Sequence, residues 1–201
     1  MNGFVAIVLN SVVAASPTTP LPWLKLDDYP TWAFAREWEG VTAMELLVAP
    51  DGKPASCTVI QSSGLKMLDH RACSVAKARA RFSPALGSDG RPVYGSYRSR
   101  IFWSADPYKW AQTETGPDLE VSLSRLPGGA TAPVDLRFAY LVDAQGNASD
   151  CTPLAKDYAQ VLVTLGCEQL LAKGANQPAA LPSRGTGPVV RTAWIRFTQS
   201  N

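Results

Sequence analysis

The fold is decided by residues 41–64, which read VTAMELLVAPDGKPASCTVIQSSG. Residues 41–48 alternate in the manner of a strand, and one face of that strand would carry Thr42, Met44, Leu46 and Val48. A hairpin turn is predicted at residues 50–53, Pro-Asp-Gly-Lys, because proline fixes φ and glycine supplies the positive φ that such turns need. Residues 55–61 return as a second strand. This stretch therefore predicts an antiparallel pair of strands.

A helix is predicted after the hairpin, over residues 66–81. Its apolar positions have the spacing of a buried stripe, and they are Leu68, Ala72, Val75 and Ala76. A third strand is predicted over residues 97–103, after a loop at residues 87–92. The unit is then β-β-α-β, a small antiparallel sheet with one helix packed on one face, and the fold class is α+β.

The four cysteines form two pairs with the same spacing. Cys57 and Cys73 are 16 residues apart, and so are Cys151 and Cys167. No CxxC motif occurs, so neither a thioredoxin-type redox centre nor a zinc knuckle is indicated. In an oxidising compartment, closing each loop would contribute about 3 kcal/mol of stability in the chain-entropy model. We therefore expect two disulfides, the first of which pins the helix to the sheet. Four unrelated buried thiols are the alternative.

An internal repeat is visible when the chain is shifted by 94 residues. The shift superimposes Leu47-Val48 on Leu141-Val142, Gly52 on Gly146, Cys57-Thr58 on Cys151-Thr152, Cys73 on Cys167, and Pro84-Ala85 on Pro178-Ala179. The elements predicted for the second copy are strands at 135–142, 149–152 and 190–197, a turn at 143–146, a helix near 165–173, and an additional leading strand at 119–123. Two β-β-α-β units follow, and each must close its own core.

The remaining segments are an amino-terminal stretch and a linker. Residues 1–22 contain an apolar run from Phe4 to Ala15 that ends in small residues and precedes a proline-rich stretch, which is typical of a secretory signal peptide. The positive charge that usually precedes such a run is missing, and the alternatives are a frayed apolar tail or a strand packed on the core. The predicted divisions are 23–104 for the first unit, 105–117 for the linker and 118–201 for the second unit.

Composition restricts the function classes. The chain has 201 residues and a net charge of +2, so it lacks the cationic field of a general nucleic-acid binder. The one histidine, His70, cannot build a His-rich metal site, and we expect it to be an exposed helix residue. Asp51 and Asp143 sit in glycine-containing turns without the alternating carboxylates of a calcium site. We expect a protein that is not an enzyme and has no cofactor, because neither a nucleophile with its base nor a metal constellation occurs.

Turn and cap signals follow one another in a characteristic order over residues 29–93. They are Tyr29-Pro30, Glu39-Gly40-Val41, Val48-Ala49-Pro50-Asp51-Gly52-Lys53, Ser62-Ser63-Gly64, Leu68-Asp69, Arg81-Phe82-Ser83-Pro84-Ala85 and Asp89-Gly90-Arg91-Pro92-Val93. In this order, the first unit resembles the carboxy-terminal domain of the TonB energy-transducer family. The second unit resembles a degenerate copy, which keeps Val142, Gly146, Pro178-Ala179 and Gly187-Pro188-Val189 but has lost Ser-Ser-Gly.

The resemblance implies a periplasmic protein-interaction domain. Family members add the short TonB-box peptide of an outer-membrane receptor to the sheet edge formed by the last strand, in the service of energy-dependent transport. An edge strand has unpaired N–H and C=O groups, and an extended peptide can satisfy them. On this sequence the binding strand would be residues 96–103. The residues implied are Tyr97, Arg98, Ser99, Arg100, Ile101 and Trp103, with Tyr29 as a further contact.

Two departures from the family keep alternatives open. The sequence has no predicted spanning helix, and residues 17–22 are a short counterpart of the family's long proline-rich spacer. A periplasmic scaffold with both sheet edges covered and no transport role is therefore the alternative function. Arg98 and Arg100 would then be solvated edge charges that deter aggregation. The expected partner is a receptor segment or another envelope protein, and a homodimer is a further option. An uncleaved segment at residues 4–15 would tether the chain to the inner membrane.

Overall fold

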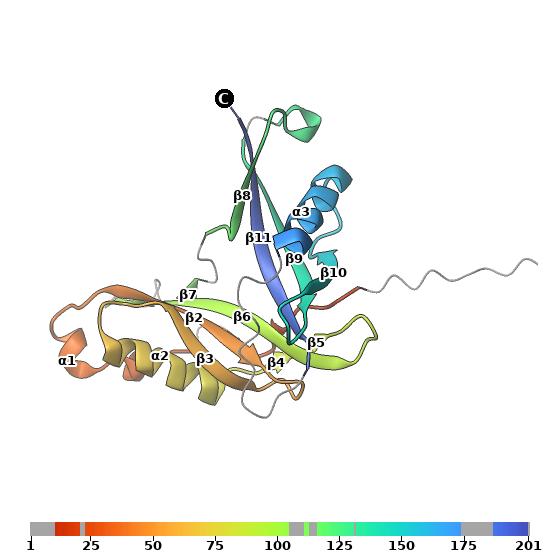
Figure 1. Ribbon diagram of the computed structural model, residues 1–201. Helices are drawn as coiled ribbons and strands as arrows, with labels where there is room; N and C mark the ends of the chain where they lie inside the picture. Colours follow the sequence, from red (N-terminus) through yellow and green to blue (C-terminus); the bar gives the residue numbers. More distant parts are fainter. Residues whose placement is uncertain are drawn as a thin grey trace, which may run out of the picture.

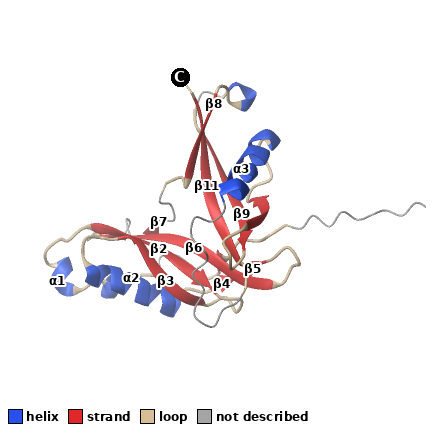
Figure 2. Cartoon of the chain, in the orientation of Figure 1, coloured by secondary structure: helices blue, strands red, loops and turns tan. Residues whose placement is uncertain are grey.

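The computed structural model describes residues 11–20, 23–104, 111–112, 116–130, 132–173 and 187–200. Residues 4–10 of the predicted signal-like segment lie outside the described residues, and so does most of the predicted linker at 105–117. The described strands belong to a nine-stranded sheet and a separate two-stranded one, and helices pack against the larger sheet (Figures 1 and 2). The chain is therefore a mixed structure of sheet and helix.

The first half of the sheet follows the sequence prediction closely. Strands β2 (Gly40–Val48) and β3 (Pro54–Gln61) form the antiparallel hairpin. Helix α2 (Lys66–Arg79) follows, and β6 (Pro92–Trp103) then pairs antiparallel with the free side of β2. The strand order is β3-β2-β6. Strand β6 begins five residues before the predicted start, within the loop predicted at residues 87–92.

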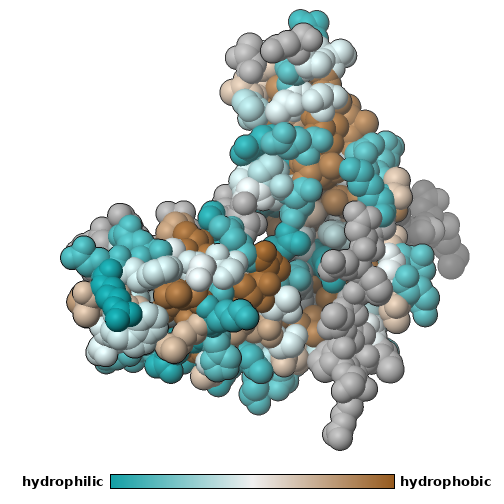
Figure 3. All heavy atoms as spheres, turned by 60° about the vertical axis from the view of Figure 1, so that its left-hand side comes forward, coloured by the Kyte–Doolittle hydropathy of each residue, from teal (hydrophilic) through white to brown (hydrophobic). Residues whose placement is uncertain are grey.

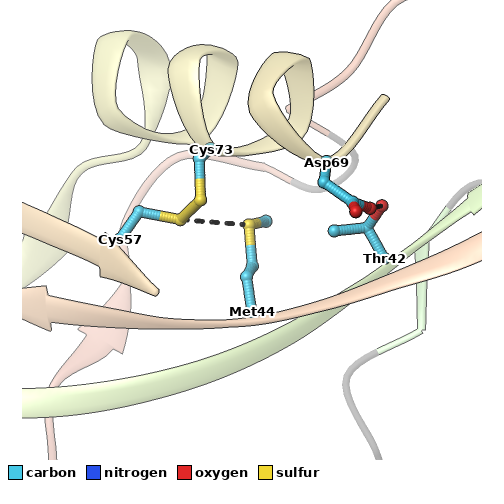
Figure 4. The surroundings of a disulfide bond; sticks show 5 residues. All are labelled: Thr42, Met44, Cys57, Asp69 and Cys73. Carbon is cyan, nitrogen blue, oxygen red and sulfur yellow. Dashed lines mark hydrogen bonds between the residues drawn. A yellow bond between two sulfur atoms is a disulfide. The ribbon is translucent and has the colours of Figure 1, made fainter. Parts of the chain in front are cut away.

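The core of this half lies between the sheet and α2. The face predicted to be apolar is fully buried, and its residues are Thr42, Met44, Leu46 and Val48. The predicted helix stripe is buried as well, and its residues are Leu68, Ala72, Val75 and Ala76. The predicted disulfide between Cys57 and Cys73 joins β3 to α2 with a Cα–Cα distance of 5.6 Å, and Met44 Sδ lies 3.8 Å from Cys57 Sγ (Figure 4).

The second half of the described structure contains three longer strands and one helix. Strands β9 (Val134–Val142) and β10 (Ala148–Pro153) are antiparallel, and α3 (Gln160–Lys173) and β11 (Val189–Gln199) follow. Strand β11 pairs antiparallel with β9, and β8 (Leu119–Leu123) adds to β11 in parallel. The predicted disulfide between Cys151 and Cys167 joins β10 to α3.

Helix α3 begins five residues before the predicted start near residue 165. Its buried residues, Leu162, Gly166 and Leu170, recur every four positions, so Leu162 extends the buried stripe by one turn. Glycine is needed at position 166 because a Cβ there would lie 2.5 Å from the ring of Phe138. The early start therefore reflects packing of the first helical turn on the sheet.

The two halves meet where β6 and β11 lie side by side. These strands are parallel, and two residue pairs join them: Val189 with Tyr94, and Val190 with Gly95. Beyond these pairs the strands diverge, and the two halves extend at a steep angle to each other (Figure 1). Val190 packs into the core of the first half rather than that of the second. The space-filling view shows hydrophilic side chains over both halves, with smaller hydrophobic areas between them (Figure 3).

Short elements complete the described structure. They are β1 (Ser16–Pro17), the 3-10 helix η1 (Leu26–Asp28), α1 (Thr31–Phe34), β4 (Phe82–Ser83), β5 (Ala85–Leu86), β7 (Ala111–Gln112) and the 3-10 turn η3 (Pro127–Gly129). Strand β1 pairs with β4, and Val12 and Ala15 are buried in the core of the first half. The described end of the amino-terminal run thus packs on the core, through an isolated bridge at Val13 and strand β1, and a signal peptide stays a prediction.

Residues 23–30 are fixed to α2 by a buried carboxylate. The side chain of Asp28 accepts a hydrogen bond from Arg71 at 2.8 Å, and Arg79 donates to both of its oxygens. Burial alone would raise the pKa of Asp28. The hydrogen bonds from Arg79 and from the Lys25 amide, with the two positive charges, outweigh that effect, so the pKa of Asp28 lies below its ordinary value.

Candidate peptide-binding edge

The predicted binding strand, β6, is paired on its inner side and partly covered on its outer side. On the inner side, residues 95–103 pair with β2 without interruption. On the outer side, β11 covers residues 94–95 and β7 covers 100–101, while β5 pairs with residues 92–93 beyond the end of β2. Among the described residues, no strand pairs with the outer side of residues 96–99. An incoming peptide would find this short stretch open and would have to displace β7 to extend further.

One face of β6 belongs to the core. Ile101 and Trp103 are buried there, and Tyr97 packs on Phe82 with ring centroids 5.1 Å apart. Tyr29 is also buried, with its ring 5.5 Å from that of Trp103. Burial raises the pKa of Tyr29, and the charge of a nearby glutamate adds to this effect. The predicted aromatic and aliphatic site residues thus hold β6 in place, and of these only Tyr97 is partly accessible to a partner.

The other face of β6 carries charged residues, as the alternation predicts. Arg98 forms ion pairs with Asp118 and with Glu45, and the distance between Arg98 Nε and Glu45 Oε1 is 3.6 Å. The guanidinium of Arg100 lies over the ring of Phe102, 5.5 Å from its centroid. Both arginines therefore have partners within the chain, although their side chains remain partly accessible.

The pairing of β6 with β11 shows which residues of β6 direct their backbone N–H and C=O groups outward. The amide and carbonyl of Trp194 both bond to Asp118, on the side of β11 that faces away from β9. Because backbone groups alternate along a strand, those of Val190 point to the same side, towards β6. The outward groups of β6 are then at the even-numbered positions Ser96, Arg98 and Arg100. Ser99 is 2% exposed, and its N–H points towards β2.

A cavity of about 500 Å³ lies where β6 and β11 diverge. Its lining includes Tyr97 and Arg98 of β6, residues 192–194 of β11, Asp118 and the amino-terminal residues 13–16. Asp118 bridges the two strands, because it bonds to the backbone of Trp194 and to the side chain of Arg98. The cavity is thus bordered by the open stretch of β6.

Sequence reasoning missed three residues around this cavity. They are Asp118, Arg137 and Trp194. The guanidinium groups of Arg137 and Arg196 lie on the Trp194 ring, each 5.1 Å from the ring centroid. The alternation of residues 119–123 predicted a strand directly after Asp118. It did not indicate which other strand this one pairs with. A pairing between β8 and β11, which are about 75 positions apart in the chain, leaves no local trace.

The Ser-Ser-Gly motif and Asp69 form a buried network beside the amino-terminal end of α2. Asp69 accepts hydrogen bonds from Thr42 Oγ1 at 2.7 Å, from Ser62 Oγ at 2.5 Å and from the Ser63 amide at 2.9 Å. Burial would raise the pKa of Asp69, but these bonds outweigh it and the pKa lies below its ordinary value. Figure 4 shows Asp69 and Thr42 pointing towards each other between α2 and β2. The network fixes α2 on the sheet.

The geometry of this half agrees with the comparison to known families. Residues 26–104 match the family model described as Gram-negative bacterial TonB protein C-terminal. The match confirms the resemblance predicted for the first unit and extends from η1 to the end of β6. The second half of the sheet and residues 11–20 lie outside it. The comparison with curated proteins found no match.

No described helix is both long enough and apolar enough to cross a membrane. The same part of the chain contains no group of three or more His, Cys, Asp or Glu side chains that could hold a metal ion.

Proposed function

We propose that this chain is a non-enzymatic envelope protein that binds an extended peptide by strand addition at the outer side of β6. The single observation that carries the proposal is the match of residues 26–104 to the TonB carboxy-terminal model, which ends on this strand. The partner would be the TonB-box segment of an outer-membrane receptor, and binding would serve energy-dependent transport. The match is to a protein-interaction domain, which supports a binding function.

The arrangement of β6 supports this location. Its core-facing residues hold the strand rigidly, while the outer side of residues 96–99 has no strand partner in the described structure. A strand held in this way keeps its outward N–H and C=O groups in register for a visiting chain. Arg98 and Arg100, on the opposite face from the core, would meet the side chains of the visitor and favour acidic ones.

Residues 118–201 would be a second, degenerate copy of the same unit. The proposal is supported by the order of its elements, strand-strand-helix-strand, and by the order β10-β9-β11, which parallels β3-β2-β6. Both disulfides span 16 residues with a Cα–Cα distance of 5.6 Å. In this copy β8 and β6 lie along the outer side of β11, so the first copy is the one we expect to bind.

A periplasmic location is part of the proposal, and the disulfides support it. Two disulfides join strands to helices, and such bonds persist in oxidising compartments. The described residues contain no free cysteine. An envelope protein that works outside the cytoplasm fits this cysteine usage.

The test compares two substitutions at one position, Arg98→Pro and Arg98→Gln. Proline removes the outward N–H of residue 98, whereas glutamine keeps it and removes the charge. With a synthetic TonB-box peptide, we expect wild-type affinity in the micromolar range of small transient contacts. Arg98→Pro should bind at least tenfold more weakly, and Arg98→Gln should retain most of the affinity. Wild-type affinity in a folded Arg98→Pro protein would contradict the proposed site.

A scaffold function is the second candidate, and one observation favours it. Strand β6 is paired on both sides at residues 95 and 100–101, so part of the proposed edge is already occupied within the chain. If the wild-type protein binds no TonB-box peptide at millimolar concentration, the scaffold becomes the better interpretation. Envelope partners would then contact surfaces other than the outer side of β6.

A further inference from the structure

Residues 12–17 lie along residues 81–86 as an added strand. The backbone of Val13 exchanges two hydrogen bonds with that of Leu86, at 3.0 and 2.9 Å. Further along, β1 pairs antiparallel with β4, with Ser16 opposite Ser83. This contact is strand addition within one chain, and the added segment, though not the residues it pairs with, lies outside the region that matches the family model.

Two small side chains seat this added strand on the core. Val12 is 3% exposed and Ala15 is 6% exposed. Opposite them, Gly95 leaves room that a larger residue would fill, since a Cβ at this position would lie 3.0 Å from Ala15 Cβ and 2.7 Å from Ala85 Cβ. The slot is therefore shaped for an extended peptide with small apolar residues three positions apart.

The bonds that hold residues 12–17 do not depend on their side chains. Among the described residues, no ion pair or side-chain hydrogen bond involves positions 11–17, and backbone bonds plus two buried side chains hold this segment. Specific contacts begin at Thr19, whose Oγ1 accepts hydrogen bonds from Trp23 Nε1 at 3.0 Å and from the Arg81 amide at 3.1 Å. The bonds of Thr19 involve no residue of 12–17, so release of that segment would not by itself break them.

The cavity beside the segment gives a replacement ligand additional room. Residues 13–16 form one wall of the cavity of about 500 Å³ between β6 and β11. A peptide that took their place could direct larger side chains into this space. The wall opposite includes Leu154 and Trp194, which offer apolar contact.

We propose that residues 81–86, together with Gly95, form a second strand-addition site for an extended segment of another protein with small apolar residues, and that residues 12–17 occupy this site as a built-in competitor. Partner binding would then require release of residues 12–17. This site lies on a different edge from the outer side of β6, so either proposal can fail without the other.

The experiment uses the full chain and a fluorescent peptide of residues 11–20, with binding measured by fluorescence anisotropy. Val13→Pro removes the N–H that bonds to Leu86 and should release the built-in segment. Val13→Thr is the matched control, because it keeps the N–H and because the Val13 side chain is 47% exposed. We expect Val13→Pro to bind the peptide at least tenfold more tightly than wild type and Val13→Thr do. A peptide with Ala15→Glu should not bind.

Two results would overturn the proposal. The first is a folded Val13→Pro protein that binds the peptide no more tightly than wild type. The second applies even if that variant fails to fold, and it uses hydrogen exchange of the wild-type chain. The Leu86 amide bonds to Val13, whereas the Phe82 amide bonds to Gly52 rather than to the segment. We expect Leu86 to exchange at least tenfold faster; equal rates would mean that the segment leaves only with global unfolding.

Discussion

Thr42 Oγ1 donates a hydrogen bond to the buried carboxylate of Asp69 at 2.7 Å, and this bond joins the central strand of the first half to the first turn of its helix. The same oxygen accepts a hydrogen bond from Trp103 Nε1 at 2.9 Å. Strand β2, helix α2 and strand β6 are therefore linked through one hydroxyl group. This network therefore helps to fix the position of β6, the proposed binding strand.

Asp69→Ala should destabilise the first half strongly. The substitution leaves the buried Thr42 hydroxyl and Ser63 amide without their acceptor, and we expect a loss of about 3 kcal/mol in the free energy of unfolding. Urea denaturation measures it. Asp89→Ala is the control, because Asp89 is an exposed turn residue, and it should lose less than about 1 kcal/mol. Equal losses would contradict the role assigned to the network.

Stability should fall as the solution becomes acidic. The pKa values of Asp28 and Asp69 are lowered in the folded chain, so the unfolded chain binds protons first when the pH falls below about 4. Their contribution is complete above that pH and is lost as the pH falls through the folded pKa values. We expect Asp28→Asn to be less stable than wild type at pH 7, with a difference that shrinks towards pH 2. Urea unfolding across this range is the measurement, and a constant difference would argue against the assignment.

Removal of either disulfide should cost a similar amount of stability. The double substitutions Cys57→Ser with Cys73→Ser, and Cys151→Ser with Cys167→Ser, each open a loop of the same length. The chain-entropy model gives about 3 kcal/mol for each loop. Thermal unfolding of the wild type and of each variant, with and without reductant, checks this value. A further variant with all four cysteines replaced lacks both bonds, and its unfolding temperature should not change when reductant is added. A reductant effect in that variant would show that the loss has another cause.

Gly52→Ala should be far more damaging than Gly90→Ala. Both glycines have positive φ, 79° and 74°, so both substitutions carry a backbone strain of about 1 kcal/mol. A Cβ at residue 52 would also lie 2.2 Å from the carbonyl oxygen of Phe82, whereas nothing lies within 4 Å of one at residue 90. We therefore expect Gly52→Ala to lose roughly 2 kcal/mol more in chemical denaturation. Similar losses in the two variants would mean that the loop around Phe82 moves away at little cost.

The first half could be predicted because its signals are local. Alternation at residues 41–48, the Pro-Asp-Gly-Lys turn and the helical spacing after Leu68 each act within a few residues, and the structure has these elements within a few positions of their predicted bounds. Because successive side chains of a strand point to opposite faces, the sequence also predicted Arg98 and Tyr97 on opposite faces of β6. The equal cysteine spacing predicted both disulfides.

The environment of the proposed edge could not be predicted, because it depends on contacts between distant parts of the chain. Nothing in the sequence around Tyr94 indicates that it lies beside Val189, and the two residues from the predicted linker that form β7 have no strand signal of their own. Val12 and Ala15 belong to the apolar run whose pattern is typical of a signal peptide. Their hydrophobicity fits export and a buried strand equally well, and the contact of Ala15 with Gly95 joins residues that are 80 positions apart in the sequence.

Strands β3 and β10 close the two ends of the main strand order, and each carries the strand cysteine of a disulfide. Outer strands are where sheets ordinarily fray and where misassembly between molecules begins. Here neither border can peel away from its helix without rupture of a covalent bond. An oxidised molecule should consequently fray less at these two borders than a reduced one.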